Sequence, residues 1–105
     1  MALAVEINGS DVILSGDVLS ADDYLSIVSC RSELEKYIAL SSGKSLKINL
    51  SLLDAVSSIV LSMFLCFIRE AKQSSCDIVF VNMSQGLFDM ARVGGVESLF
   101  PRLGQ

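Results

Sequence analysis

The chain has 105 residues, is 51% hydrophobic and carries a formal net charge of −4. This length and composition suit one domain with its own hydrophobic core, and we interpret residues 1–105 as that domain. Lys and Arg are not clustered, which argues against nucleic acid as a partner, because phosphate backbones require concentrated positive charge.

The residue types also exclude most enzyme chemistries. The sequence has no histidine, which removes Ser-His-Asp and Cys-His catalysis and nearly all zinc sites. Cys30, Cys66 and Cys76 form neither a C-x-x-C pair nor an even-numbered disulfide framework, so we interpret them as small buried hydrophobic residues. No glycine-rich phosphate-binding loop is present. We therefore expect no catalytic residue, no metal site, no cofactor and no enzymatic activity.

Neither export nor membrane insertion is indicated by the sequence. Residues 1–6 lack the basic region and the long apolar run of a signal peptide. The apolar run at residues 59–68 is about half of what a bilayer-spanning helix needs. We therefore expect a cytoplasmic protein without a membrane span.

The N-terminal residues predict a β-hairpin. Leu3, Val5 and Ile7 alternate with other residues, which indicates a strand. Residues 8–11 contain Asn-Gly, which is a strong signal for a hairpin turn. A second strand, antiparallel to the first, is expected at residues 12–14 and should end at residues 15–17.

A helix is predicted after this hairpin, from about residue 21 to residue 40. Ser20 is its expected N-cap, and acidic residues in the first turn suit the helix dipole. Residues 41–43 end it with Ser-Ser-Gly. Its apolar face is predicted to consist of Ile27, Cys30, Leu34, Tyr37 and Ile38.

The centre of the chain predicts a strand, a turn and a second helix. Leu46, Ile48 and Leu50 share one side of the strand, and residues 51–56 read as a turn. The helix that follows, ending near residue 73, is more apolar than the burial of one face requires. Either a neighbouring helix of this chain or another protein covers the excess. Its polar stripe consists of Ser58, Ser62, Cys66, Arg69 and Gln73.

The last third of the chain predicts one more strand and one more helix. The unbroken apolar run at residues 78–81 is typical of an interior parallel strand covered on both faces. Ser84 is the expected N-cap of a helix that turns Leu87, Met90 and Ala91 inward and ends at two glycines. Residues 96–100 are predicted to form a short edge strand or a turn.

This order of elements predicts an α/β fold. We expect a mostly parallel sheet of four or five strands with one antiparallel N-terminal hairpin, because strands joined by helices form right-handed parallel crossovers. The first two helices are expected to pack mainly on one face of the sheet, and the third near an edge.

Two serines at the start of the central helix have two interpretations. Ser57 and Ser58 are typical N-cap residues, which stabilise a helix by about 1 kcal/mol. An exposed hydroxyl at a helix N-terminus is also a favourable place for a phosphate group, because of the helix dipole and the free amides. Both interpretations hold if they apply to different residues of the pair.

Several short segments match, in order and spacing, the motifs of one known family. Residues 14–18 (LSGDV) stand where that family has L-S-G-E-L, and residues 48–51 (INLS) stand at its I-D-L-S strand. Residues 56–61 (VSSIVL) stand at V-D-T-G-G-L. Ala71-Lys72 matches the end of the family's second helix. Residues 91–93 (ARV) match its A-K-L motif, and residues 99–102 (LFPR) match its V-L-P-R motif. With these motifs the chain resembles a STAS domain, and it resembles most the MlaB-like branch.

The resemblance has departures at the helix start. Ser57 stands at the family's Asp, and Ser58 stands at its Thr or Ser. Ile59 stands where phospho-switched antagonists have their phosphoserine, and Val60 replaces a glycine. The usual phosphorylation site is therefore absent, which leaves Ser58 or Ser57 as candidates. Both replacements are expected to make this surface more apolar, which favours a constitutive protein contact over a charge switch.

The resemblance implies a cytoplasmic, non-enzymatic subunit of an ABC phospholipid transporter that maintains outer-membrane lipid asymmetry. It would bind the ATPase subunit, and through it a permease complex at the inner membrane. The expected contact centres on Ser57, Ser58, Ile59, Leu61 and Ser62, with Asp17 in a neighbouring loop.

Other functions stay open at this point. An anti-sigma factor antagonist would bind a kinase-like anti-sigma factor instead of an ATPase. A small-ligand sensor would use the apolar central helix to line a pocket. We also expect weak self-association of the isolated chain through the surface at residues 59–68.

Overall fold

A computed structural model of the chain describes residues 3–17, 24–54 and 58–96. The order of elements agrees with the prediction up to residue 96, and the predicted edge strand or turn at 96–100 lies almost wholly outside the described residues. The elements are β1 (Ala4–Asn8), β2 (Asp11–Asp17), α1 (Tyr24–Ala39), β3 (Ser45–Asp54), α2 (Ser58–Gln73), β4 (Asp77–Val81) and α3 (Gln85–Val93).

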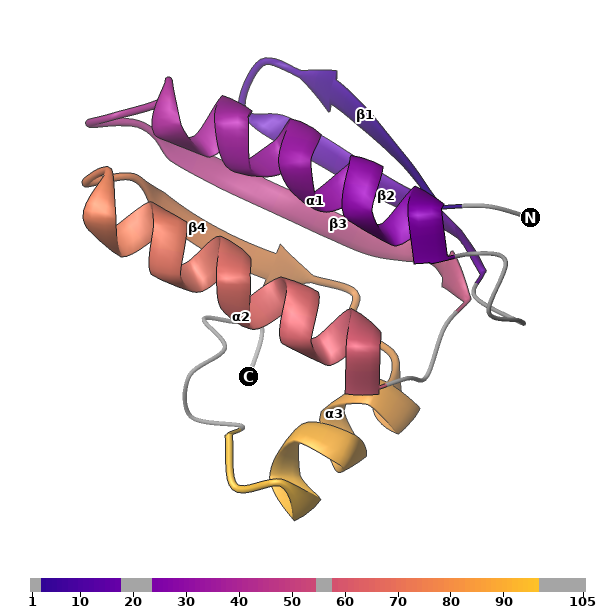
Figure 1. Cartoon of the computed structure of the whole chain (residues 1–105). Coiled ribbons are helices and arrows are strands. Elements are labelled where there is room, and N and C mark those ends of the chain that lie inside the picture. The colour runs from indigo at the N-terminus through magenta and orange to yellow at the C-terminus, as the bar shows by residue number, and fades with distance from the viewer. Residues whose placement is uncertain (1–2, 18–23, 55–57, 97–105) are drawn as a thin grey trace.

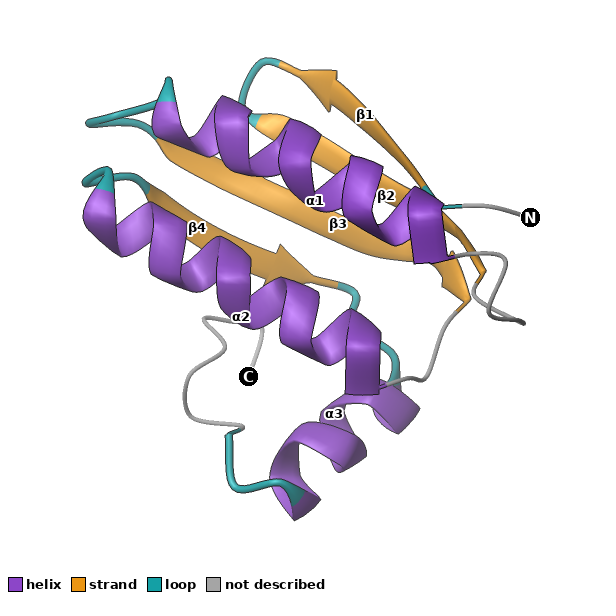
Figure 2. Ribbon diagram, viewed as in Figure 1, coloured by secondary structure: helices purple, strands orange, loops and turns teal. Residues whose placement is uncertain are grey.

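The described strands form one mixed sheet in the order β1-β2-β3-β4 (Figure 2). β1 and β2 pair antiparallel around a two-residue turn, in which Gly9 has a φ of 65°. β2, β3 and β4 are parallel to one another. The predicted fold class, a mostly parallel sheet with one antiparallel N-terminal hairpin, is confirmed.

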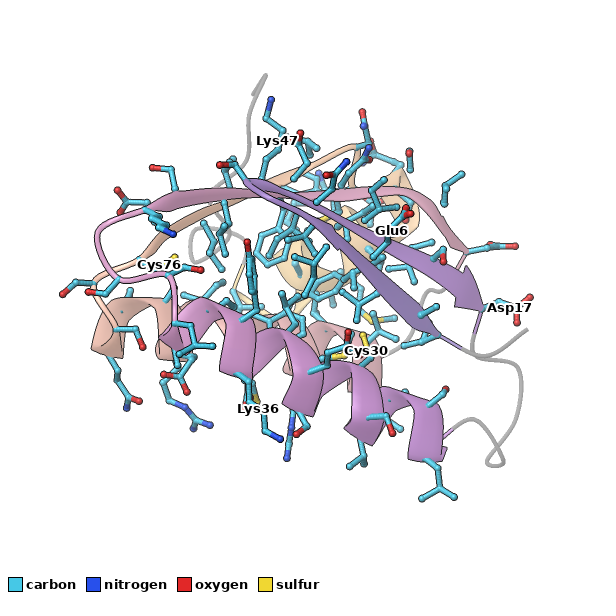
Figure 3. The ribbon with its side chains drawn as sticks, turned by 90° about the horizontal axis from the view of Figure 1, so that it is seen from above. Glu6, Asp17, Cys30, Lys36, Lys47 and Cys76 are labelled. Atoms are coloured by element: carbon cyan, nitrogen blue, oxygen red, sulfur yellow. The ribbon has the colours of Figure 1, made fainter. Side chains whose placement is uncertain are left out.

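α1 and α2 lie side by side over the same face of the sheet (Figures 1 and 3). α3 lies beyond the carboxyl end of β4, near the start of α2 (Figure 1). The core lies between the helices and the sheet, where Phe64 of α2 packs on Phe80 of β4 with ring centroids 5.1 Å apart. The predicted inward face of α1 is confirmed: Ile27, Cys30, Leu34 and Ile38 are buried and Tyr37 is partly buried.

β3 is longer than the sequence pattern predicted. The turn expected at residues 51–56 is wrong for residues 51–54, which continue the strand to Asp54. The pairing of β2 with β3 shifts between Ile13 and Ser15, so that β3 accommodates one extra residue. This bulge reverses the alternation, and Leu53 points into the core although its position should face solvent.

β4 is not an interior strand of the sheet that the structure describes, as its apolar run predicted. It pairs with β3 only, so it forms one edge. Ile78 and Phe80 are buried against the helices, whereas Val79 and Val81 are half-buried on the opposite face. Full burial of both faces is therefore not needed to explain this run.

The ends of the last helix agree with the prediction. The Ser84 side chain accepts a hydrogen bond from the Leu87 amide at 3.2 Å, which makes Ser84 the N-cap. Gly94 is the C-cap. Leu87 and Ala91 are buried and Met90 is half-buried, so this helix turns its apolar side inward as expected.

Candidate functional site

The candidate site lies where the parallel strands end and α2 begins. Asp17, the last residue of β2, is in register with Asp54, the last residue of β3. Asp17 is half-buried and points away from the body of the molecule at the end of β2 (Figure 3). Ser57 lies outside the described residues. The fold therefore brings Asp17 to the end of the sheet at which α2 starts, as the last residue of β2 and not in the loop that the sequence predicted.

The first two turns of α2 supply the exposed part of the site. Ser58 and Ser62 are exposed and lie one helical turn apart, so their side chains share a side of the helix. Ile59 keeps 48% of its surface exposed. These three residues form the surface that we call the α2 start.

Two neighbouring residues do not belong to this surface. Leu61 is only 7% exposed and Val60 is fully buried, both within the core. The prediction that Leu61 contributes to an exposed contact is wrong, and so is the expectation that Val60 makes the surface more apolar. Val60 and Leu61 belong to the core, whereas Ile59 and Ser62 border the cleft between α2 and α1.

The polar stripe predicted along α2 is confirmed. Ser58, Ser62, Arg69 and Gln73 are exposed, and Cys66 between them is half-buried. The excess of apolar residues is covered within this chain by α1 and the sheet, since α1 and α2 are in contact. Of the two alternatives for this excess, the neighbouring helix of the same chain is therefore correct for the buried residues.

A narrow cleft of about 130 Å³ runs between α1 and α2 next to the α2 start. Ile59 and Ser62 border it from α2, and Val28 and Arg31 border it from α1. The sequence analysis missed the contribution of α1. A signal was present, because Leu25 and Val28 are apolar residues on the side of α1 that the periodicity assigned to solvent, and both are exposed in the structure.

Charges of both signs lie near the α2 start, with Asp17 and Asp54 at the strand ends and Arg31 at the cleft, whereas the cations of α2 lie farther along that helix. Arg69 and Lys72 are exposed on α2, and the Arg31 guanidinium lies across the cleft, 3.8 Å from the Glu35 carboxylate. Glu70 is half-buried and accepts a hydrogen bond from the Ser74 hydroxyl at 2.9 Å. Among the described residues, the cleft is therefore bordered mainly by apolar side chains and by one cation, Arg31, which lies beside Glu35.

The buried cysteines have the properties of structural residues. Burial raises the pKa of the Cys30 thiol to about 11, and the nearby Glu33 carboxylate acts in the same direction. Burial also raises the pKa of the Cys76 thiol, with a smaller effect from Asp77. Both thiols stay protonated at neutral pH, and a protonated thiol is a poor nucleophile.

Metal and membrane sites were also sought in the described part of the chain. Within residues 3–17, 24–54 and 58–96, His, Cys, Asp and Glu side chains nowhere gather in a group of three that could hold a metal ion. None of the helices described there is long and apolar enough to span a membrane.

Sequence comparisons give no relative for this chain. No family model matches the sequence, and no curated protein matches it significantly.

Solved structures do match, over nearly the whole chain. The unphosphorylated anti-sigma factor antagonist SpoIIAA has a TM-score of 0.67 and 14% identity, and the match covers 99% of this chain and 90% of that one. An anti-sigma factor antagonist from Mycobacterium paratuberculosis has a TM-score of 0.70 and 16% identity, with 99% and 86% of the two chains covered. A STAS-domain anti-sigma-factor antagonist from Planctomyces limnophilus has a TM-score of 0.69 and 12% identity, with 98% and 90% covered. The chain therefore has the STAS fold of these antagonists.

Proposed function

We propose that this chain is a non-enzymatic STAS subunit that binds the ATPase of an ABC phospholipid transporter through the α2 start and the adjacent cleft. Through this ATPase it would associate with a permease complex at the inner membrane and support the maintenance of outer-membrane lipid asymmetry. Asp17 and Ser57 are further candidates for this contact.

One observation carries the proposal: Ile59 is 48% exposed at the beginning of α2. By resemblance, this is the position at which phospho-switched antagonists have their phosphoserine. An isoleucine cannot be phosphorylated. Because its side chain is half-exposed, its burial against a partner stabilises the complex. This residue therefore supports a constitutive apolar contact rather than a reversible charge switch.

Such a subunit acts through differential binding. If it binds one conformation of the ATPase more tightly than another, it shifts the conformational equilibrium of the ATPase toward that conformation. The size of this shift is limited by the difference between the two binding free energies. No reacting group is needed for this mechanism, in agreement with the protonated Cys30 and Cys76 thiols.

A second function is an anti-sigma factor antagonist, and the solved structures with this fold favour it. In that case the α2 start would bind a kinase-like anti-sigma factor. Ser58 is exposed, so its hydroxyl is accessible to a kinase at this surface. The replacement of the usual phosphoserine position by Ile59 argues against this alternative.

Affinity purification of the tagged chain from its own cells, read by mass spectrometry, tests the proposal. Recovery of an ABC ATPase together with a permease is the expected result. Recovery of an anti-sigma kinase, together with phosphate on Ser58 or Ser57, would replace the proposal with the second function. A lipid that copurifies with the purified chain would favour a small-ligand sensor.

A further inference from the structure

We propose that the partner bound at the α2 start presents two side chains to the cleft between α1 and α2. One is apolar and enters the cleft, and the other is a carboxylate that binds Arg31. This inference rests on the proposed function, because it assigns the chemistry that the partner must offer to the same site. It makes Arg31 a residue that determines which surface is recognised.

The cleft has an apolar floor and an apolar rim. Ile27 of α1 and Met63 of α2 border it and are almost completely buried. Val28 and Ile59 border it from the same two helices and are partly exposed. Water against such walls finds few hydrogen-bond partners, so its replacement by an apolar side chain is favourable.

The size of the cleft suits one side chain. Its volume is about 130 Å³, and an apolar cavity of about 150 Å³ holds one benzene molecule. One aromatic ring or one branched aliphatic side chain therefore fills it. Cys66, which is half-buried and lies two turns beyond Ile59 along α2, borders the cleft on the side away from the α2 start.

Arg31 supplies the charge at this cleft. Of the side chains that border it in the described part of the chain, Arg31 is the only charged one. Its Nε lies 3.8 Å from a Glu35 carboxylate oxygen, which is beyond hydrogen-bond distance. Because the guanidinium offers five N–H donors, it can bind a second carboxylate in a bidentate manner without releasing Glu35.

The other charges near the site set the direction of the contact. α1 and α2 follow parallel strands, so both helices start near the same end of the sheet (Figure 1). Asp17 and Asp54 lie at that end, whereas Arg31 lies two turns along α1. A carboxylate of the partner is repelled at the strand ends and attracted at Arg31. The acidic side chain therefore lies farther from the strand ends than the apolar one.

The spacing on α1 sets the spacing that the partner needs. Val28 and Arg31 are three residues apart in the helix, so their Cβ atoms lie about 5–6 Å apart. A partner helix offers a similar separation between residues i and i+3 or i+4, and a partner strand offers it between residues i and i+2. The occupant is thus a protein segment with an aromatic or branched apolar residue and an Asp or Glu at one of these spacings.

Small probes test the chemistry of the cleft on the purified full chain. Benzoate has a ring and a carboxylate, benzamide has the ring without the charge, and acetate has the charge without the ring. In two-dimensional NMR titrations, benzoate should shift the amide signals of Val28, Ile59 and Met63 and bind about threefold more tightly than benzamide. Acetate should leave these signals unchanged.

Arg31→Gln assigns the preference for the charged probe. In this variant benzoate should bind no more tightly than benzamide, because the guanidinium is absent and the apolar walls are intact. Equal affinities of the two probes in the wild type would overturn the proposal. A preference for benzoate that persists in Arg31→Gln, or probe binding outside the cleft, would overturn it as well.

Affinity capture with two cleft variants tests the partner. Cys66→Phe fills the cleft with a ring and Arg31→Glu reverses its charge, so each should reduce recovery of the ATPase about tenfold. Lys36→Glu is the matched control, because it makes the same change in net charge at an exposed position of α1 that does not border the cleft. It should recover the ATPase like the wild type. If circular dichroism shows that Cys66→Phe is unfolded, Arg31→Glu decides.

The outcomes separate this inference from the proposed function. Loss of the ATPase with Ile59→Asp, together with normal recovery by both cleft variants, would overturn the inference and leave the proposed function standing. Absence of an ATPase from the wild-type capture would contradict the proposed function, and the probe titrations would then decide the chemistry of the cleft. Sedimentation equilibrium of the chain alone completes the test: self-association that Cys66→Phe abolishes would make a second copy the occupant and overturn the proposal.

Discussion

Ile59 and Val60 are adjacent in α2, yet Val60 is fully buried and Ile59 keeps 48% of its surface exposed. One side chain fixes the helix to the core, and the other is available to a partner. The proposed binding surface therefore has a boundary between two consecutive residues, and substitutions on either side of it should have different effects.

Aspartate substitutions at these two positions should separate stability from binding. Ile59→Asp should change the free energy of unfolding by less than about 1 kcal/mol, because the site is half-exposed and an acid suits the first turn of a helix. Val60→Asp should prevent folding, because it buries an unpaired carboxylate. Circular dichroism shows whether Val60→Asp is folded, and urea unfolding measures the stability of Ile59→Asp. Similar losses of stability in the two variants would contradict this boundary.

Ser58→Asp should weaken binding to the partner ATPase without unfolding the chain. The new charge would enter an apolar contact next to Ile59, where its desolvation is not compensated. We expect about a tenfold loss of affinity in a calorimetric titration. Val93→Asp is the matched control, since Val93 is 87% exposed on α3, and it should bind like the wild type. Unchanged affinity of Ser58→Asp would place the contact elsewhere.

Phe64→Ala should destabilise the fold strongly. Phe64 is fully buried between Phe67 and Phe80, with ring centroids 6.4 Å and 5.1 Å away. Removal of such a ring costs about 3–5 kcal/mol, from lost burial and the cavity that remains. Denaturant titration gives the value, and Val93→Ala serves as an exposed control with little change expected. A loss below 1 kcal/mol on the same scale would mean that this cluster is not packed as described.

The pH dependence of stability should reflect the Cys30 thiol. Its pKa is about 9 in the unfolded chain and about 11 in the folded chain, so the folded state holds this proton more tightly. The stabilisation is present below pH 9 and is lost as the pH rises toward 11, with a slope of up to about 1.4 kcal/mol per pH unit. Urea midpoints measured between pH 8 and 11 test this.

A cysteine variant assigns this pH dependence. In Cys30→Ala, which retains Cys76, the fall in stability between pH 9 and 11 should become shallower. Cys66→Ser changes a half-buried residue of the α2 stripe and should keep the slope of the wild type. An identical slope in Cys30→Ala and the wild type would exclude Cys30 as its source.

The sequence predicted the elements whose patterns are local. The alternation of apolar and polar residues predicted β1 and β2, and the N-cap residue Ser84 predicted the start of α3. The extension of β3 to Asp54 escaped prediction because a bulge reverses the alternation, and bulges depend on pairing with β2, which no local pattern encodes.

The candidate site was predicted only in part for a similar reason. Ser58, Ile59 and Ser62 are exposed as expected, because N-cap position and helical period are local properties. The burial of Leu61 depends on how α2 is rotated against α1, and so does the contribution of Val28 to the cleft. Such rotation is a tertiary property that the apolar composition of α2 did not reveal.

Quantitative affinity capture with the wild-type chain and Ile59→Asp, performed side by side from the same cells, tests the central claim most directly. The account predicts an ABC ATPase and its permease with the wild type, and a large loss of both with the variant at equal bait levels. Equal recovery with both baits would contradict a contact at the α2 start. Recovery of an anti-sigma kinase with the wild type would contradict the proposed partner.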